Sequence, residues 1–264
     1  MVIKLILKSD EYRFRYVAAL KACSLHLLLS GVLALIVGFF IFRVWYPHPY
    51  GELSGGKNIF LLLIGVDVVC GPLLMLILFD KLKSRSELLR DIGLIAIIQL
   101  AALGYGVFTV WQARPLFLVQ EIDRFKVISA PDLLNSSISS LPKSLMPAWH
   151  TGPIAIAIRA PVNEEERLSV LFESIRGGRD YAERPEFYLP YAGENALKSI
   201  KFAKPLPVFL KRWPNQLAAA ENIASVAKID LLSAVYLPVV GREDWIAVLN
   251  YQGQILGFLK GDGF

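Results

Sequence analysis

The stretch NIFLLLIGVDVVCGPLLMLILF, residues 58–79, decides how the rest of the chain can fold. At ~1.5 Å per residue, a helix of this length crosses the ~30 Å hydrocarbon core of a bilayer. The run contains one carboxylate, Asp67, and an acid at that depth is costly unless it is protonated or has a partner. Gly71 and Pro72 follow and favour a kink or a close approach of another helix. We therefore predict a transmembrane helix with a polar, closely packed interior.

Hydropathy divides the chain into two parts. Hydrophobic residues make up 55% of the 264 residues, and the long apolar runs all fall within residues 1–112. This part contains 11 Lys and Arg against 7 Asp and Glu, whereas residues 113–264 contain 17 against 16. The net charge of +5 therefore comes mainly from the flanks of the apolar runs. This distribution argues against a nucleic-acid-binding surface.

Two further apolar runs, residues 22–46 and 92–111, are also long enough to cross a bilayer. The first run is too long for the core of a signal peptide, and bulky residues follow it where a cleavage site would lie. Residues 1–21 are expected to be a cytoplasmic flank, with an amphipathic helix on the membrane surface as the alternative. The predicted organisation is this flank, a three-helix transmembrane region to residue 112, and a soluble domain over residues 113–264.

The basic residues between the apolar runs predict the orientation in the membrane. The first loop, residues 47–57, has the single cation Lys57, and the second loop, residues 80–91, has four. Five precede the first run, namely Lys4, Lys8, Arg13, Arg15 and Lys21. Cytoplasmic loops carry the excess of Lys and Arg, so the N-terminus and the second loop are expected inside. Residues 113–264 then lie outside, in the periplasm if this is a protein of the bacterial inner membrane.

Depth in the bilayer suggests a partner for Asp67. The second helix runs inward and the third runs outward, which brings Tyr105 to about the depth of Asp67. Two interpretations remain open. Asp67 either is protonated and holds the three helices together, or contacts the helix of another protein together with Gly71, Pro72 and Tyr105.

The soluble part has an α+β pattern with an antiparallel C-terminal sheet. Alternation predicts one or two strands over residues 116–128 and another over 154–158. Helices are expected over residues 163–178, 193–202 and 214–229, and the first of them begins with a capping-box pattern at Asn163 and Glu166. Residues 232–261 resemble three antiparallel strands with turns at 241–244 and 252–253.

The residues that carry chemistry predict no active site. Cys23 and Cys70 both fall in apolar runs, so the soluble domain has neither a disulfide framework nor a zinc spacing. His150 is its single histidine, and no Gly-x-Ser-x-Gly turn presents a nucleophile. The acidic residues 164–166 lie at a predicted helix start, where carboxylates stabilise the helix dipole. We therefore assign no catalytic residue, cofactor or metal site.

Four segments together resemble the TfpX/TfpZ family of type IV pilin accessory proteins. They are VWYPHPYGELSGG at 44–56, LLLIGVDVVCGPLL at 61–74, QARPLFLVQEIDRFKVISAPDL at 112–133 and LPVVGREDWIAVLNYQGQILGFLKG at 237–261. The resemblance implies a bacterial inner-membrane protein that supports the stability or assembly of its cognate major pilin. It implies no catalytic activity and brings no established site residues.

The expected partners are the lipid bilayer and a pilin, both its transmembrane helix and its periplasmic head. Alternation cannot bury every aromatic residue of the last three strands, so Tyr236, Trp245 and Tyr251 are expected to contribute a pilin-contact surface. In the alternative, a blunted edge and a covering helix hide this sheet. The competing functions are a membrane-anchored periplasmic enzyme and a structural or sensor subunit of another envelope complex. An enzyme predicts convergent titratable groups in a pocket, and a chaperone predicts an apolar groove or a sheet edge.

Overall fold

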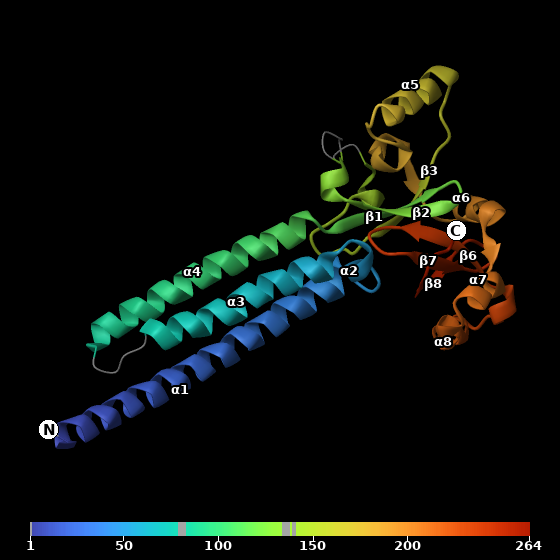
Figure 1. The fold of residues 1–264 in the computed structure, drawn as a ribbon. Coiled ribbons are helices and arrows are strands. Elements are labelled where there is room, and N and C mark those ends of the chain that lie inside the picture. The colour runs from blue at the N-terminus through green and yellow to red at the C-terminus, as the bar shows by residue number, and fades with distance from the viewer. Residues whose placement is uncertain (1, 79–82, 134–137, 139–140) are drawn as a thin grey trace. The chain divides into compact units, whose positions relative to one another are not determined.

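Three long helices dominate the first half of the chain (Figure 1). The structure is a computed structural model that describes residues 2–78, 83–133, 138 and 141–264; the side chains of residues 2–16, 18, 66, 67, 76 and 78 lie outside this description. The long helices are α1 (Val2–Phe40), which continues as a π-helical turn (Ile41–Trp45), α3 (Gly56–Leu78) and α4 (Arg85–Gln112). Segments of all three are long and apolar enough to cross a membrane, in agreement with the three long apolar runs of the sequence.

The chain forms two compact units. Residues 42–56, predicted as part of the transmembrane region, belong to the unit that contains the α+β domain. The helical unit comprises residues 1–41 and 57–111, and the second unit comprises residues 42–56 and 112–264. Residues 42–56, here called loop 42–56, connect α1 and α3 along the chain but pack with the α+β domain. We call the second unit the outer domain, after its expected location.

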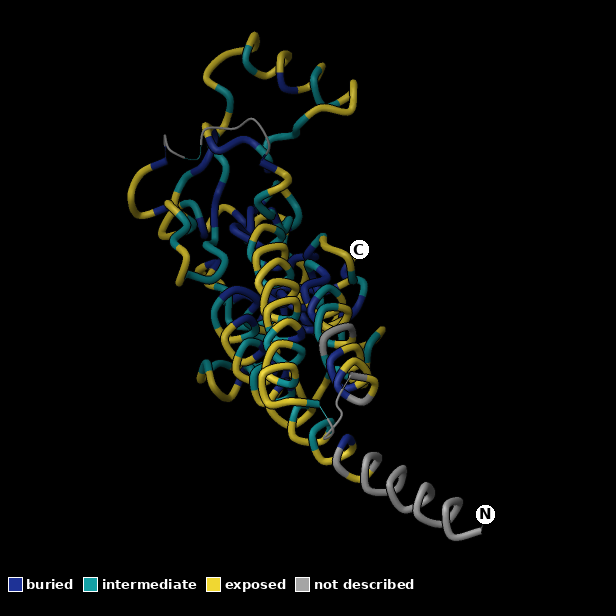
Figure 2. Tube along the Cα trace, turned by 90° about the vertical axis from the view of Figure 1, so that its left-hand side faces the viewer, coloured by how far each residue is buried: buried dark blue, intermediate teal, exposed yellow. Residues whose placement is uncertain are grey.

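Small residues allow the helices of the first unit to pack closely. A Cβ atom at Gly38 of α1 would lie 2.5 Å from the Phe60 ring of α3, and one at Gly106 of α4 would overlap Leu63 of α3. Close packing at glycines is typical of membrane helices, whose association gains little from the hydrophobic effect. Exposed residues follow these helices in Figure 2, and many of them are large and apolar, as a lipid-facing surface requires.

The outer domain is built on one mixed sheet. Its strands are β1 (Pro115–Glu121), β2 (Arg124–Ser129), β3 (Ile154–Ile158), β4 (Tyr188–Pro190), β5 (Lys204–Pro205), β6 (Val235–Val240), β7 (Trp245–Leu249) and β8 (Ile255–Lys260). Their order is β4-β3-β1-β2-β6-β7-β8, and β5 also pairs with β6. The strands β6, β7 and β8 are antiparallel as predicted. The sheet is not purely antiparallel, however, because β1 pairs with β3 and β2 pairs with β6 in parallel.

Both faces of the C-terminal strands are covered. On one face, the helices α7 (Leu206–Arg212) and α8 (Leu217–Ala227) pack on Tyr236, Ile246 and Val248. On the other face, loop 42–56 contributes Tyr50 and Leu53 to a core with Leu237, Ala247 and Leu249. Alternating side chains of β6 and β7 therefore point into two different cores, whereas most of β8 is only partly buried.

The remaining helices agree largely with the sequence pattern. The helix α5 (Glu164–Ile175) begins at Asn163, whose side chain accepts a hydrogen bond of 2.8 Å from the Glu166 N–H. The other predicted helices are α6 (Glu194–Ser199) with a 3-10 turn after it, and α8 with a 3-10 turn before it. The short helices α2 (Tyr50–Leu53) and α7 were not predicted. The Ser-rich stretch 135–147 is typical of a short helix or loop, and its residues 135–137 and 139–140 lie outside the description.

Candidate functional site

Gly71 lies where all three long helices meet. The residue is buried, and a Cβ atom there would lie 2.5 Å from His26 Nε2 of α1 and still closer to Gln99 Nε2 of α4. The His26 Nε2 atom is itself buried and has no hydrogen-bond partner in the described part of the chain. Two polar side chains thus pack on a glycine inside an apolar bundle. Sequence reasoning did not place His26 and Gln99 here, although a polar residue inside an apolar run is the signal that points to them.

The structure places Asp67, Pro72 and Tyr105, the other residues that the sequence singles out in the apolar helices, on α3 and α4. Asp67 precedes Gly71 by four residues on α3, so its Cα lies on the same helix face. Its side chain is outside the described residues, and its pairing with Tyr105 stays a prediction. Pro72 is buried within α3, which continues past it. Tyr105 is 74% exposed on α4.

The three aromatic residues of the C-terminal strands have different environments. Tyr236 is buried with its ring 5.5 Å from that of Phe209, and Trp245 is buried edge-on to His48 at 5.4 Å. These two residues therefore belong to the core and offer no surface to a partner. The reason is the two-sided cover of β6 and β7, which the sequence pattern does not reveal. Tyr251, in the turn between β7 and β8, is 59% exposed.

Loop 42–56 is held to the β6–β7 turn by backbone and side-chain contacts. The Arg242 N–H donates to the Leu53 carbonyl at 2.6 Å, and Leu53 is fully buried. The Lys260 ammonium pairs with both Glu52, at 3.2 Å, and Glu243, at 2.6 Å. The loop is therefore a structural part of the outer domain, a role that its glycines and prolines did not suggest.

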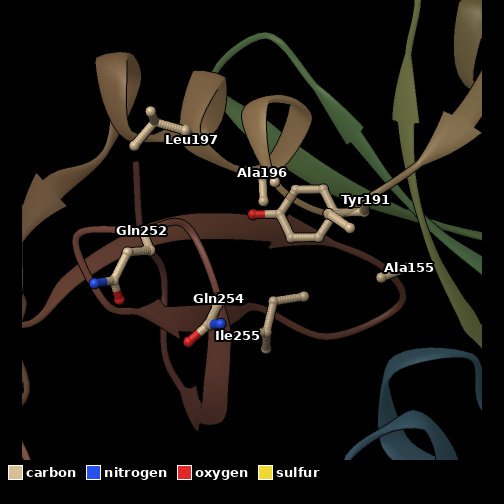
Figure 3. Close-up of a pocket in the computed structure, with 9 residues that line it drawn as sticks. Ala155, Tyr191, Ala196, Leu197, Gln252, Gln254 and Ile255 are labelled. Atoms are coloured by element: carbon tan, nitrogen blue, oxygen red, sulfur yellow. The ribbon is translucent and has the colours of Figure 1, made fainter.

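A cavity of about 560 Å³ lies beside the exposed Tyr251 turn. Helix α6 contributes one wall, and the β7–β8 turn with the start of β8 contributes the opposite wall (Figure 3). The lining residues are Ala155, Tyr191, Ala192, Gly193, Ala196, Leu197, Gln252, Gln254 and Ile255. Most of this surface is apolar, and two side-chain amides supply its polar groups.

Tyr191 fixes the shape of this cavity. Its hydroxyl donates to the Gly253 carbonyl at 2.6 Å and lies 3.0 Å from Ser199 Oγ. Gly253 has a φ of +78°, and a Cβ atom there would overlap the Ala196 carbonyl, so the turn requires glycine. Burial raises the pKa of the Tyr191 phenol, which keeps the hydroxyl neutral and available as a donor.

The residues that line this cavity suit the binding of an apolar group better than acid–base catalysis. Tyr191 is the one titratable residue among the nine that line the cavity, and its hydroxyl is already engaged. Apolar walls with a few amides suit an apolar side chain of a partner. Elsewhere in the described residues, no group of three or more His, Cys, Asp or Glu side chains is arranged to hold a metal ion.

Comparisons with known proteins point to one family. Residues 14–55 match the family model described as "Fimbrial assembly protein FimB". The chain is 35% identical over 258 residues to the "Fimbrial assembly protein, serogroup I" of Dichelobacter nodosus, a match that covers 95% of this chain and 98% of the relative. The serogroup E1 protein of the same organism is 34% identical with the same coverage. No solved structure matches the chain.

Proposed function

Because this chain belongs to the fimbrial assembly protein family, we propose that it is a non-enzymatic, membrane-anchored accessory protein of type IV fimbrial assembly. The relatives are named fimbrial assembly proteins, and three apolar helices suit an anchor in the membrane. The likeness to TfpX/TfpZ proteins supports a more specific role. In that role, the protein binds its cognate major pilin in the bacterial inner membrane and supports its stability or assembly in the manner of a chaperone.

The distribution of positive charge supports the location of each part. The flanks of the apolar helices favour a cytoplasmic N-terminus and a periplasmic outer domain. A pilin in the same membrane presents its transmembrane helix and its head to these two units. Two modest contacts then reinforce each other, because the first contact raises the effective concentration of the second.

The observation that carries the proposal is the apolar cavity beside the Tyr251 turn. Leu197, at the wall of the cavity, is 53% exposed, so a large apolar side chain is available to a partner. The cavity also adjoins β8, the last strand in the sheet order, whose outer edge pairs with no strand in the described residues. An apolar hollow next to a strand edge suits the binding of a protein segment.

Substitutions at the cavity test this proposal. We expect Leu197→Asp and Tyr251→Asp each to lower the amount of pilin that co-purifies with the full-length protein about tenfold. This loss corresponds to ~1.4 kcal/mol, a modest value for a contact at an interface. Ile122→Asp is the matched control, because Ile122 is 72% exposed in the β1–β2 turn. If both variants retain pilin as the control does, neither the cavity nor the adjoining Tyr251 turn is the contact.

A further inference from the structure

Helix α5 is attached to the outer domain by its charged side. The guanidinium group of Arg159 binds Glu166 through two hydrogen bonds of 2.8 and 2.9 Å, and Arg184 pairs with Glu173. Between these glutamates, Val170 is buried. Positions 166, 170 and 173 follow a spacing of four and three residues, so they form one face of the helix, and this inner face contacts the domain.

The opposite face of α5 is apolar and exposed. Leu168, Leu171, Phe172 and Ile175 are 40%, 48%, 56% and 72% exposed. Their spacing of three, one and three residues forms a continuous stripe, which we call the outer stripe. In Figure 2, α5 is the uppermost helix and is coloured mostly as exposed. A surface helix normally buries its apolar face, so this orientation is the reverse of the usual one and indicates a binding surface.

We propose that the outer stripe binds the outer stripe of a second copy of this chain, with the two α5 helices antiparallel. The stripe is centred between Leu171 and Phe172, so a two-fold axis at that point places Leu171 beside Leu171 of the second copy on one flank and Phe172 beside Phe172 on the other. Leu168 and Ile175 then face each other at both ends. Such a contact is self-complementary, as a two-fold interface requires.

The charges beside the stripe fit the same arrangement. Glu165 and Arg176 are exposed and lie on the same flank of the stripe by helical geometry. In the antiparallel pair, Glu165 of one copy and Arg176 of the other lie within ~3 Å of each other along the axis, at ~1.5 Å per residue. Two opposite-charge pairs form, one at each end. A hollow of about 510 Å³, lined partly by Phe172 and Arg176, lies on this flank and leaves room for a partner's side chain.

Charge also argues against a lipid surface as the occupant. The first turn of α5 carries three glutamates, residues 164–166, and anionic headgroups repel carboxylates. One helix from each copy makes a small interface, so the association is expected to be weak in dilute solution. Confinement of both copies to one membrane raises their effective concentration and favours pairing.

Disulfide crosslinking of the full-length protein in its native membrane tests the contact. In a background with Cys23→Ala and Cys70→Ala, we expect Leu171→Cys to form a covalent dimer on mild oxidation. Leu232→Cys is the matched control, because Leu232 is 70% exposed away from α5. We expect at least tenfold more dimer from Leu171→Cys. Equal yields from the two variants would overturn the proposal.

Exchanging the charges of Glu165 and Arg176 tests whether the partner at the outer stripe is a second copy of this chain. In the Leu171→Cys background, Glu165→Arg and Arg176→Glu should each lower the dimer yield severalfold, and the two together should restore it. Restoration supports self-pairing, because another partner would not compensate for both changes. Loss of crosslinking in the double variant, a crosslink to a different protein in place of the dimer, or labelling of the introduced thiol by a lipid-phase reagent would contradict the proposal. The pilin contact is on a different surface, so its test is independent of this one.

Discussion

At Gly71, side chains from both other long helices lie within 2.5 Å of the position that a Cβ atom would take. We expect Gly71→Leu to destabilise the helical unit by ~1–3 kcal/mol, the usual cost of excess volume in a packed interior. Gly65→Leu is the control on the same helix, because a Cβ atom at Gly65 has no neighbour within 4 Å among the described residues. Thermal unfolding in detergent, followed by helical circular dichroism, measures both. Equal midpoints would show that the junction at Gly71 is not closely packed.

The attachment of α5 to the outer domain depends on pH through the ionisation of Glu166. Its hydrogen bonds with Arg159, and then with the Val162 N–H, lower its pKa from 4.5 to about 2. A carboxylate with a lowered pKa stabilises the folded state fully above its unfolded pKa, and this stabilisation is lost as the pH falls towards 2. We therefore expect hydrogen-exchange protection of the α5 amides to decrease between pH 4.5 and 2.

Two variants isolate this effect. Glu166→Gln should reduce the protection of α5 at neutral pH and remove most of its change between pH 4.5 and 2. Glu165→Gln changes an exposed neighbour and should leave the wild-type pH dependence intact. If Glu166→Gln keeps the full dependence, another carboxylate is responsible, and Glu173 beside Arg184 is the first alternative.

At the scale of single elements, loop 42–56 has a larger structural role than its length suggests. Leu53 is fully buried against the β-sheet core, although it lies between the long helices α1 and α3 in the sequence. We expect Leu53→Ala to destabilise the outer domain by ~2–5 kcal/mol, as for other large-to-small changes in a core. Urea unfolding monitored by tryptophan fluorescence measures this loss.

Glu52→Gln is the matched change in the same loop. It weakens an exposed ion pair with Lys260, and such pairs contribute ~1 kcal/mol or less. If Leu53→Ala loses the expected ~2–5 kcal/mol and Glu52→Gln changes little, the loop stabilises the domain through packing. Similar midpoints for Leu53→Ala and the wild type would show that the loop is dispensable to the domain.

Local patterns predicted most of these elements, whereas pairing between distant segments was not predictable. The hairpins β1–β2 and β6–β7–β8 follow from alternation and nearby turns, and α5 follows from its capping residues. The parallel pairing of β2 with β6 joins Phe125 to Val239, and no local signal encodes a partner so far along the chain. The burial of Trp245 was unpredictable for the same reason. Trp245 was expected at the surface because the covering residues of loop 42–56 are remote in sequence.

At the scale of the whole molecule, the distribution of positive charge predicts the topology. We expect a cytoplasmic N-terminus, a cytoplasmic second loop and an outer domain on the other side of the membrane. An alkaline phosphatase fusion at Gly263 should be active, and one at Ser86 should be inactive, because this enzyme is active outside the cytoplasm. The reverse pattern would invert the topology and remove the outer domain from the side where a pilin head lies.

We propose that the outer domain binds the major pilin at the cavity beside the Tyr251 turn. The most direct measurement is site-specific photocrosslinking in living cells, with a photoreactive residue at position 251 and, as the control, at position 122. Both positions are exposed, and they lie in different turns of the same domain. We expect a crosslinked product at position 251 that contains the major pilin, with little or none at position 122. A pilin product of equal yield at both positions, or none at position 251, would contradict it.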